Sequence, residues 1–213
     1  MSENTKKGAL LVVSGFSGAG KGTVMKKLLE KYDTYALSIS MTTRAPRTGE
    51  ENGREYFFVD TDTFEQKIKE NKVIEYAKYC DNYYGTPREY VEEQLEKGKD
   101  VILEIEIQGA LKVKEMFPDT VLLFIMPPSA EELQRRLVSR GTETADVIKK
   151  RMNRAVEEAQ FMEKYDYIVI NDDLDTCVEE LHGIVKTVHQ EALRNEEKIK
   201  EMKKELEELS KGE

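Results

Sequence analysis

The chain has 213 residues, of which 39% are hydrophobic, and its 33 Lys and Arg against 42 Asp and Glu give a formal net charge of −9 at pH 7. This length allows one well-buried domain, and the apolar content excludes a disordered chain. The acidic balance argues against general nucleic-acid binding, and the longest apolar runs, 9–13 and 121–126, are too short to cross a bilayer.

The amino-terminal residues 1–7 are polar and carry no apolar stretch typical of a signal peptide. Only two cysteines occur, Cys80 and Cys177, and their spacing is not that of metal ligands. Because free thiols persist in a reducing compartment, these features predict a cytoplasmic protein.

Apolar runs that favour strands alternate with segments of helical periodicity. The run 9–14 predicts a buried strand, and a helix is expected from Lys21 to about Tyr32, with Val24 and Leu28 on one face. Strands that alternate with helices form a mainly parallel sheet covered on both faces, so the predicted fold class is α/β. The later strands are expected at 100–109, 120–128 and 165–171, and the helices between them at 110–116 and 130–138.

Two stretches interrupt this alternation. Residues 38–97 are rich in Thr, Arg, Tyr, Gly and Glu, with short strand-like pieces such as 55–59. Residues 136–155 are rich in arginine. An inserted polar lobe and an arginine-rich hairpin on an α/β core are typical of a protein that closes over anionic ligands.

The stretch "GFSGAGKGT" between the first strand and the first helix predicts a phosphate-binding loop. Glycines let successive backbone N–H groups point at phosphate oxygens, and the following helix adds its dipole. Lys21 is expected to contact the β- and γ-phosphates. The predicted ATP contacts in this loop are Gly15, Phe16, Ser17, Gly18, Ala19, Gly20, Lys21, Gly22 and Thr23.

Gly22 stands where such loops usually place the Ser or Thr that binds Mg²⁺. We therefore expect no direct metal ligand, and the ion to be held by phosphates and water. The hydroxyl of Thr23 can instead donate to a phosphate farther back along the nucleotide. The form "GAGKGT" resembles adenylate kinases, which are nucleoside monophosphate kinases.

The inserted segment resembles guanylate kinases more specifically. "SISMTTRAPRTGEENGREYFFV" (38–59) and "VIEYAKYCDNYYGTPREYV" (73–91) carry their motifs in order and at matching spacing. With the loop and "LEIEIQGA", the resemblance covers residues 9–190. It implies a single P-loop kinase domain that transfers phosphate from ATP to GMP with Mg²⁺. The implied parts are a core (about 8–37, 98–135 and 156–190), a GMP-binding lobe (38–97), a lid (136–155) and a helical tail (190–213).

Arg44 and Arg47 flank Ala45–Pro46, and two rigid guanidinium groups suit a phosphate monoester. The resemblance adds the hydroxyls of Tyr56 and Tyr84 at the same phosphate.

Glu75 can accept hydrogen bonds from both N1–H and the N2 amino group of guanine, whereas adenine offers an acceptor at N1 and is rejected. The resemblance adds Ser40 and Thr86 as donors to guanine O6 or N7.

In "VILEIEIQG", alternation places Glu104 and Glu106 on one strand face, at the ligand-binding carboxyl end of the sheet. Guanylate kinases usually show Asp at both positions. Glu104 is expected to reach the guanine or an ordered water. Glu106 is expected to organise Mg²⁺ water or Lys21, with an ion pair to Lys21 alone as the alternative.

Phosphoryl transfer needs in-line positioning and charge stabilisation rather than a nucleophilic side chain. Arg136, Arg140 and Arg151 match the lid arginines of guanylate kinases, and Arg154 lies on the same helical side as Arg151. With Lys21 and Arg44, these three are the predicted catalytic residues. Asn171, in "NDD", matches the family stretch near the ATP base, whereas His182 and His189 are expected to be packing or surface residues.

Two alternatives remain open. Another nucleoside monophosphate kinase is favoured only by "GKGT". A guanylate-kinase-like module that binds phosphorylated ligands without catalysis would keep Arg44, Arg47 and Tyr84, but it would not need Lys21 or the lid arginines.

The carboxyl-terminal segment shows apolar residues at alternating spacings of four and three from Leu174 to Leu209, interrupted only by Asn195. This pattern predicts one continuous helix that packs on the sheet up to about Val188. Ile199, Met202, Leu206 and Leu209 then lie on a solvated helix end, fold back on the domain, or pair with another subunit.

Overall fold

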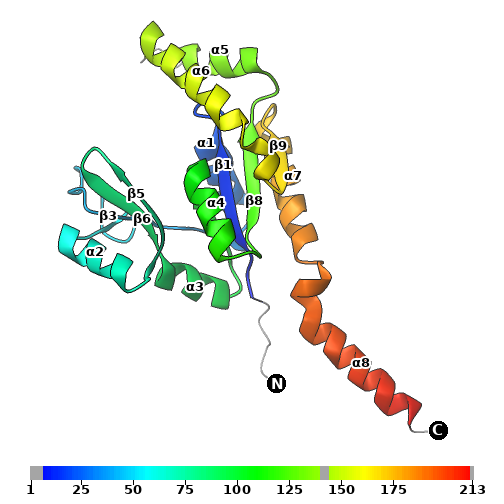
Figure 1. Ribbon diagram of the computed structural model, residues 1–213. Coiled ribbons are helices and arrows are strands. Elements are labelled where there is room, and N and C mark those ends of the chain that lie inside the picture. The colour runs from blue at the N-terminus through cyan, green and yellow to red at the C-terminus, as the bar shows by residue number, and fades with distance from the viewer. Residues whose placement is uncertain (1–6, 140–143, 212–213) are drawn as a thin grey trace.

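A computed structural model describes residues 7–139 and 144–211, which are built around two separate β-sheets (Figure 1). The larger sheet has five parallel strands in the order β2–β7–β1–β8–β9, which confirms the predicted α/β class. In the register of the central strand, Leu11 is the partner of both Ile102 and Val121. The strands are β1 (Leu10–Gly15), β2 (Tyr35–Leu37), β7 (Asp100–Glu104), β8 (Val121–Met126) and β9 (Tyr167–Ile170).

Helices cover both faces of this sheet because its strands are apolar on both sides. Helix α4 (Ile107–Met116) lies in front of β1 in Figure 1, and α1 (Lys21–Lys31) lies behind it. Helix α1 packs against α7 (Leu174–Val188), and α3 (Arg88–Glu96) packs against β7. Leu11, Val12 and Val13 of β1 are consequently fully buried.

The smaller sheet is formed within the polar insertion and has its own core. Its strands run in the order β4–β3–β6–β5, and Met41, Phe64 and Val73 form a separate buried cluster beneath them. Asp60 caps the amino terminus of α2, because its carboxylate accepts a hydrogen bond from the Thr63 N–H at 2.6 Å. The elements are β3 (Met41–Thr42), β4 (Phe57–Phe58), α2 (Thr61–Lys69), β5 (Val73–Tyr79) and β6 (Asn82–Pro87).

Two further helices, α5 (Ala130–Ser139) and α6 (Ala145–Ala159), form a pair beyond the carboxyl ends of β1 and β8 (Figure 1). The predicted lid residue Arg140 lies outside the described residues. A short 3₁₀ helix, η1 (Met162–Lys164), connects α6 to β9. No helix among the described residues is long and apolar enough to cross a membrane.

The predicted strand 100–109 is wrong in its second half. Strand β7 ends at Glu104, and α4 begins at Ile107, so Glu106 occupies the residue before the helix rather than a strand face. Ile107, Ala110 and Val113 are buried at a spacing of three, so a helical pattern starts where the strand-like alternation still continues. Their burial against the sheet decides in favour of the helix.

The predicted continuous carboxyl-terminal helix is also wrong. Helix α7 ends at Val188, followed by a 3₁₀ turn, η2 (Ala192–Asn195), and a separate helix, α8 (Glu196–Ser210). Glu191 is extended (φ −58°, ψ 140°), which interrupts the helix. The predicted packing of α7 is confirmed, because its apolar side chains Val178, Leu181, Val185 and Val188 are buried.

Candidate active site

The phosphate loop connects β1 to α1 and is curved by left-handed glycines. Gly18 and Gly20 have φ values of 98° and 89°. A Cβ added at Gly20 would lie 2.5 Å from the amide nitrogen of Asn171, so only glycine fits there. The same Asn171 amide donates to the Ala19 carbonyl at 2.8 Å and holds the curve. No side-chain hydrogen bond caps the start of α1 at Gly20, and the amino terminus of a helix carries the positive end of its dipole.

Gly22 and Thr23 lie in the first turn of α1. A Cβ added at Gly22 would meet no atom within 4 Å, so packing does not require glycine there. Thr23 is exposed at the helix start. A serine or threonine side chain would therefore fit at residue 22, so packing does not explain why the Mg²⁺-binding hydroxyl is missing there.

Lys21 folds back over the loop from which it starts. Its ammonium group donates to the carbonyls of Gly15 at 2.8 Å and Phe16 at 3.2 Å. It lines a cleft of about 540 Å³ together with Ser17, at the carboxyl ends of β1 and β7. A cation anchored on a glycine-rich loop before a helix amino terminus is placed to meet phosphate oxygens.

Glu104 ends β7, and its side chain is open to the same cleft. The surrounding protein raises its pKa by desolvation, although the nearby Lys21 charge acts in the opposite direction. The cleft thus holds a carboxylate beside the cation. The sequence pattern placed Glu106, and not Glu104, beside Lys21 and assigned Glu104 to the guanine or an ordered water.

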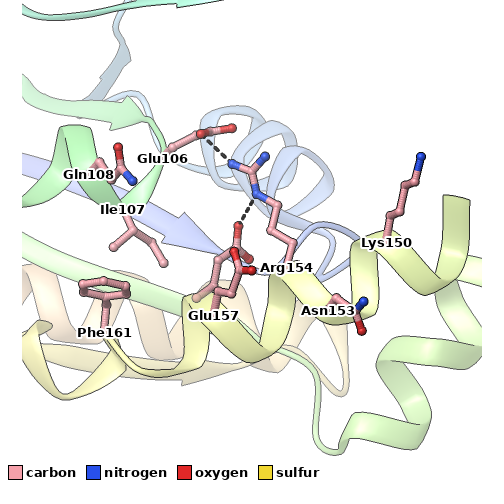
Figure 2. A pocket seen from close by; sticks show the side chains of 9 residues that line it. Glu106, Ile107, Gln108, Lys150, Asn153, Arg154, Glu157 and Phe161 are labelled. Atoms are coloured by element: carbon pink, nitrogen blue, oxygen red, sulfur yellow. Dashed lines mark hydrogen bonds and ion pairs between the residues drawn. The ribbon is translucent and has the colours of Figure 1, made fainter.

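Helix α6 supplies two arginines to this cleft. Arg151 donates to the Ser17 hydroxyl at 3.1 Å, which places its guanidinium group at the phosphate loop. Arg154 donates to Glu106 at 2.7 Å and to Glu158 at 3.0 Å. Figure 2 shows Arg154 reaching across an adjoining cavity of about 570 Å³ to Glu106. The structure therefore pairs Glu106 with Arg154, a partner that the sequence did not indicate.

Arg136 and Asn171 meet behind the loop. Arg136 donates to the Asn171 carbonyl at 2.9 Å and to Glu132, four residues earlier on α5, at 2.6 Å. Asn171 is itself buried and bonded to the loop. These contacts connect the α5 arginine to the segment that positions Gly20.

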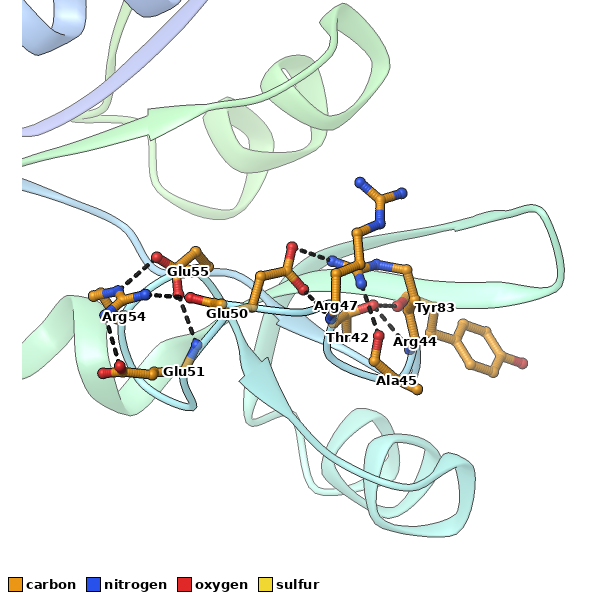
Figure 3. Close-up of polar contacts among 10 residues, drawn as sticks. Thr42, Arg44, Ala45, Arg47, Glu50, Glu51, Arg54, Glu55 and Tyr83 are labelled. Atoms are coloured by element: carbon orange, nitrogen blue, oxygen red, sulfur yellow. Dashed lines mark hydrogen bonds and ion pairs between the residues drawn. The ribbon is translucent and has the colours of Figure 1, made fainter.

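The predicted acceptor-phosphate residues gather on the smaller sheet. Arg44 donates to Glu50 at 2.9 Å, and its guanidinium carbon lies 5.4 Å from the centre of the Tyr56 ring. The rings of Tyr56 and Tyr84 are 6.0 Å apart in an edge-to-face contact. Glu50 also accepts from the Arg47 backbone N–H at 2.7 Å, whereas the Arg47 guanidinium group points away from it (Figure 3). The arginine-bearing turn is thus held by one carboxylate that sequence reasoning missed.

Glu75 lies on β5 where the smaller sheet faces the larger one. Its carboxylate accepts from the buried hydroxyl of Thr86 at 2.8 Å. A Cβ added at Gly109 on α4 would lie 3.2 Å from the other Glu75 oxygen. Burial raises the pKa of Glu75, and this effect exceeds the opposite effects of the Thr86 hydrogen bond and the Lys112 charge. Ser40, which is half-buried, directly precedes β3 in the same sheet.

A sequence profile of guanylate kinases matches residues 7–188. A guanylate kinase of Oceanobacillus iheyensis is 50% identical over 202 residues, which covers 95% of this chain and 97% of the relative. One of Caldanaerobacter subterraneus subsp. tengcongensis is 54% identical over 180 residues (84% of this chain, 87% of the relative). The crystal structure of guanylate kinase from Anaplasma phagocytophilum matches with a TM-score of 0.68 and 36% identity, covering 89% of this chain and 90% of that one. The chain belongs to the guanylate kinase family.

Proposed function

We propose that this chain is an ATP:GMP phosphotransferase, which transfers the γ-phosphoryl group of ATP to GMP and yields ADP and GDP. The observation that carries the proposal is the joint presence of a donor cleft with Lys21 and Arg151 and an acceptor cluster with Arg44 and Glu75. Binding of a phosphorylated ligand alone would need only the second of these.

On the donor side, the loop N–H groups and the α1 dipole hold the β- and γ-phosphates of ATP. Lys21 and Arg151 then meet the charge that develops on the moving phosphoryl group, with Arg136 and Arg140 as further lid arginines. The transfer requires that the attacking and leaving oxygens be held in line, and no covalent enzyme intermediate is needed.

On the acceptor side, Arg44 and Arg47 bind the GMP phosphate with the hydroxyls of Tyr56 and Tyr84. Glu75 accepts from guanine N1–H and the N2 amino group. Further contacts to the base are assigned to Ser40, Thr86 and Glu104. Glu50 accepts from the Arg44 guanidinium group, so the GMP phosphate would join or replace that carboxylate.

Kinases of this family use ATP with a divalent metal, and we assign Mg²⁺. Among the described residues, no group of three or more His, Cys, Asp or Glu is placed to hold a metal ion, and residue 22 has no side chain. We assign the ion to nucleotide phosphates and water, and Glu106, which lines the cleft, would accept from that water. Such an ion would neutralise charge on the β- and γ-phosphates.

We further assign three working parts to the single domain. Residues 38–97 form the GMP-binding lobe, 136–155 form the lid, and the remainder up to about residue 190 forms the core. Closure of the lid and lobe over both nucleotides would exclude water and bring the Arg151 and Arg44 clusters together.

The reaction can be tested by coupling ADP formation to NADH oxidation with GMP, AMP, UMP and dGMP as acceptors. We expect rapid turnover with GMP and at least about 10³-fold lower kcat/KM with AMP and UMP. With AMP, the acceptor atom N1 of adenine would face the acceptor oxygens of the Glu75 carboxylate. Turnover with AMP equal to that with GMP would support the broader monophosphate kinase. GMP binding without ADP formation would support the non-catalytic module.

Replacing Arg151 by alanine should lower kcat by about 10²-fold or more while changing the Kd of either nucleotide only a few-fold, because its contact to the phosphoryl group matures in the closed state. The matched control is Arg135→Ala, since Arg135 is mostly exposed on α5 and forms an ion pair with Glu132 of the same helix. Steady-state kinetics and isothermal titration separate the two effects. A loss confined to GMP affinity would place Arg151 in the acceptor site instead.

A further inference from the structure

Gly109 lies in the first turn of α4, where the backbone itself does not require a glycine. The helix begins at Ile107, and the φ of Gly109 is not positive, so any residue could adopt this conformation. Glycine is the least favourable residue in a helix apart from proline, because it loses the most freedom on folding. Gly109 therefore weakens α4, and the groups around it supply a reason for its presence.

The space beside Gly109 is filled by the carboxylate of Glu75. Helix α4 packs against β5, the strand that carries Glu75. A Cβ at residue 109 would lie 3.2 Å from Oε2 of Glu75, 3.7 Å from its carboxyl carbon and 3.4 Å from Cδ1 of Ile105. The contact to Oε2 is tighter than Cβ atoms ordinarily make. An alanine at this position would therefore displace the carboxylate by a few tenths of an ångström.

The position of this carboxylate matters as much as its charge. Oε1 of Glu75 accepts from the hydroxyl of Thr86 at 2.8 Å, and Thr86 is buried. One oxygen is thus held from the lobe side, whereas the other lies against α4. Guanine presents N1–H and the N2 amino group side by side at a fixed spacing, so a carboxylate that accepts from both has to be placed correctly.

We infer that Gly109 is a positioning residue for guanine recognition, because its missing side chain leaves the space in which the Glu75 carboxylate is held. The inference rests on the proposed function, in which Glu75 accepts from N1–H and the N2 amino group of guanine. Gly109 acts through Glu75, and no contact of its own with either nucleotide is assigned. The lower stability of α4 accompanies the correct placement of one carboxylate.

The substitution Gly109→Ala tests the inference in the coupled assay of ADP formation. It should raise the KM for GMP by about tenfold, since a misplacement of about 1 Å can cost about 10²-fold and this displacement is smaller. The kcat at saturating GMP and the KM for ATP should stay at parental values, because the lost interaction is made in the ground state and on the acceptor side only.

The matched control is Gly183→Ala. Gly183 lies within α7, and a Cβ there would meet no atom within 4 Å. This variant gains the same helix-favouring residue without displacing a neighbour, so its melting temperature should be at or above the parental value and all kinetic constants should be unchanged.

Removing the carboxylate separates an effect through Glu75 from one through Ile105 or the fold of α4. In a Glu75→Ala background, residue 109 has no carboxylate to displace, so the single variant E75A and the double variant E75A/G109A should have the same kcat/KM for GMP. If Gly109→Ala alone melts below the parent, E75A/G109A should melt no lower than E75A, because the crowding has been relieved.

A parental KM for GMP in Gly109→Ala would overturn the inference. A further loss of kcat/KM or of melting temperature on adding Gly109→Ala to Glu75→Ala, or an equal rise in the KM for both nucleotides, would also overturn it. Failure of the proposed function itself is distinguishable, because the parent would then form no ADP with GMP, or Glu75→Gln would keep parental kinetics.

Discussion

Replacing Lys21 by alanine should lower kcat for ADP formation by about 10³-fold or more, because the lysine meets charge on the moving phosphoryl group in a site that water does not screen. The fold should persist, since the hydrogen bonds that the side chain donates to the carbonyls of Gly15 and Phe16 lie within its own loop. GMP affinity should also largely persist, because every residue assigned to GMP except Glu104 lies in the lobe of the smaller sheet. Single-turnover kinetics and titration of GMP give the two readouts.

The matched control for this substitution is Lys26→Ala. Lys26 lies on the same helix, is mostly exposed and forms an ion pair with Glu30 at 3.9 Å. Activity within a few-fold of the parent in both variants would show that Lys21 does not contact the transferred group. A decline in both would indicate that damage to α1 is responsible.

Replacing Glu75 by glutamine should lower kcat/KM for GMP by about 10³-fold with little change in the KM for ATP, because an amide NH₂ then opposes the donors of guanine in a buried site. The Thr86 hydroxyl can still donate to the glutamine oxygen, so local structure should be kept. Glu65→Gln is the control, since Glu65 lies on α2 of the same lobe and accepts a hydrogen bond from the Tyr83 hydroxyl. Equal losses for both nucleotides would contradict the assignment of Glu75 to guanine.

The same variant has a stability signature. Because burial raises the pKa of Glu75 in the folded protein, its ionised form is disfavoured by folding. The contribution of this carboxyl group to stability is therefore present below its unfolded pKa and is lost as the pH rises through the folded pKa. Glu75→Gln should be at least as stable as the parent at pH 7, with its advantage shrinking as the pH is lowered. Thermal melts over this range measure the difference.

Local signals predicted much of this molecule. The phosphate loop needs glycines, a preceding strand and a following helix, all within about twenty residues, and the structure confirms each of them. The strand end at Glu104 was harder to predict, because strand-like alternation and the helical spacing of Ile107 overlap there. The break after Val188 has neither Gly nor Pro to mark it, and it is held by Arg194 on Asp119, a contact between distant residues.

The site residues also divide into those that a local motif predicts and those that only long-range packing brings together. Lys21, Arg44 and Glu75 could be predicted as site residues because each belongs to a contiguous motif. The pair Glu106–Arg154 joins residues 48 positions apart, and the Arg136–Asn171 contact joins residues 35 apart. Only the packing of α6 and α5 on the sheet brings these together, so single-sequence reasoning has no local pattern from which to infer them.

The central position of β1 has a consequence for synthesis of the chain. Its neighbours β7 and β8 lie much later in the sequence. The Ala9 N–H donates to the Asp100 carboxylate, 91 residues on, and this hydrogen bond cannot form until that residue has been synthesised. At typical elongation rates this segment takes roughly 5–20 s to emerge from the ribosome. During that time the apolar run Leu10–Val13 has no sheet partner, whereas the hairpin of β5 and β6 can already close. The nascent chain therefore exposes an apolar segment without a strand partner near its amino terminus, and exposed segments of this kind are the ones that chaperones bind.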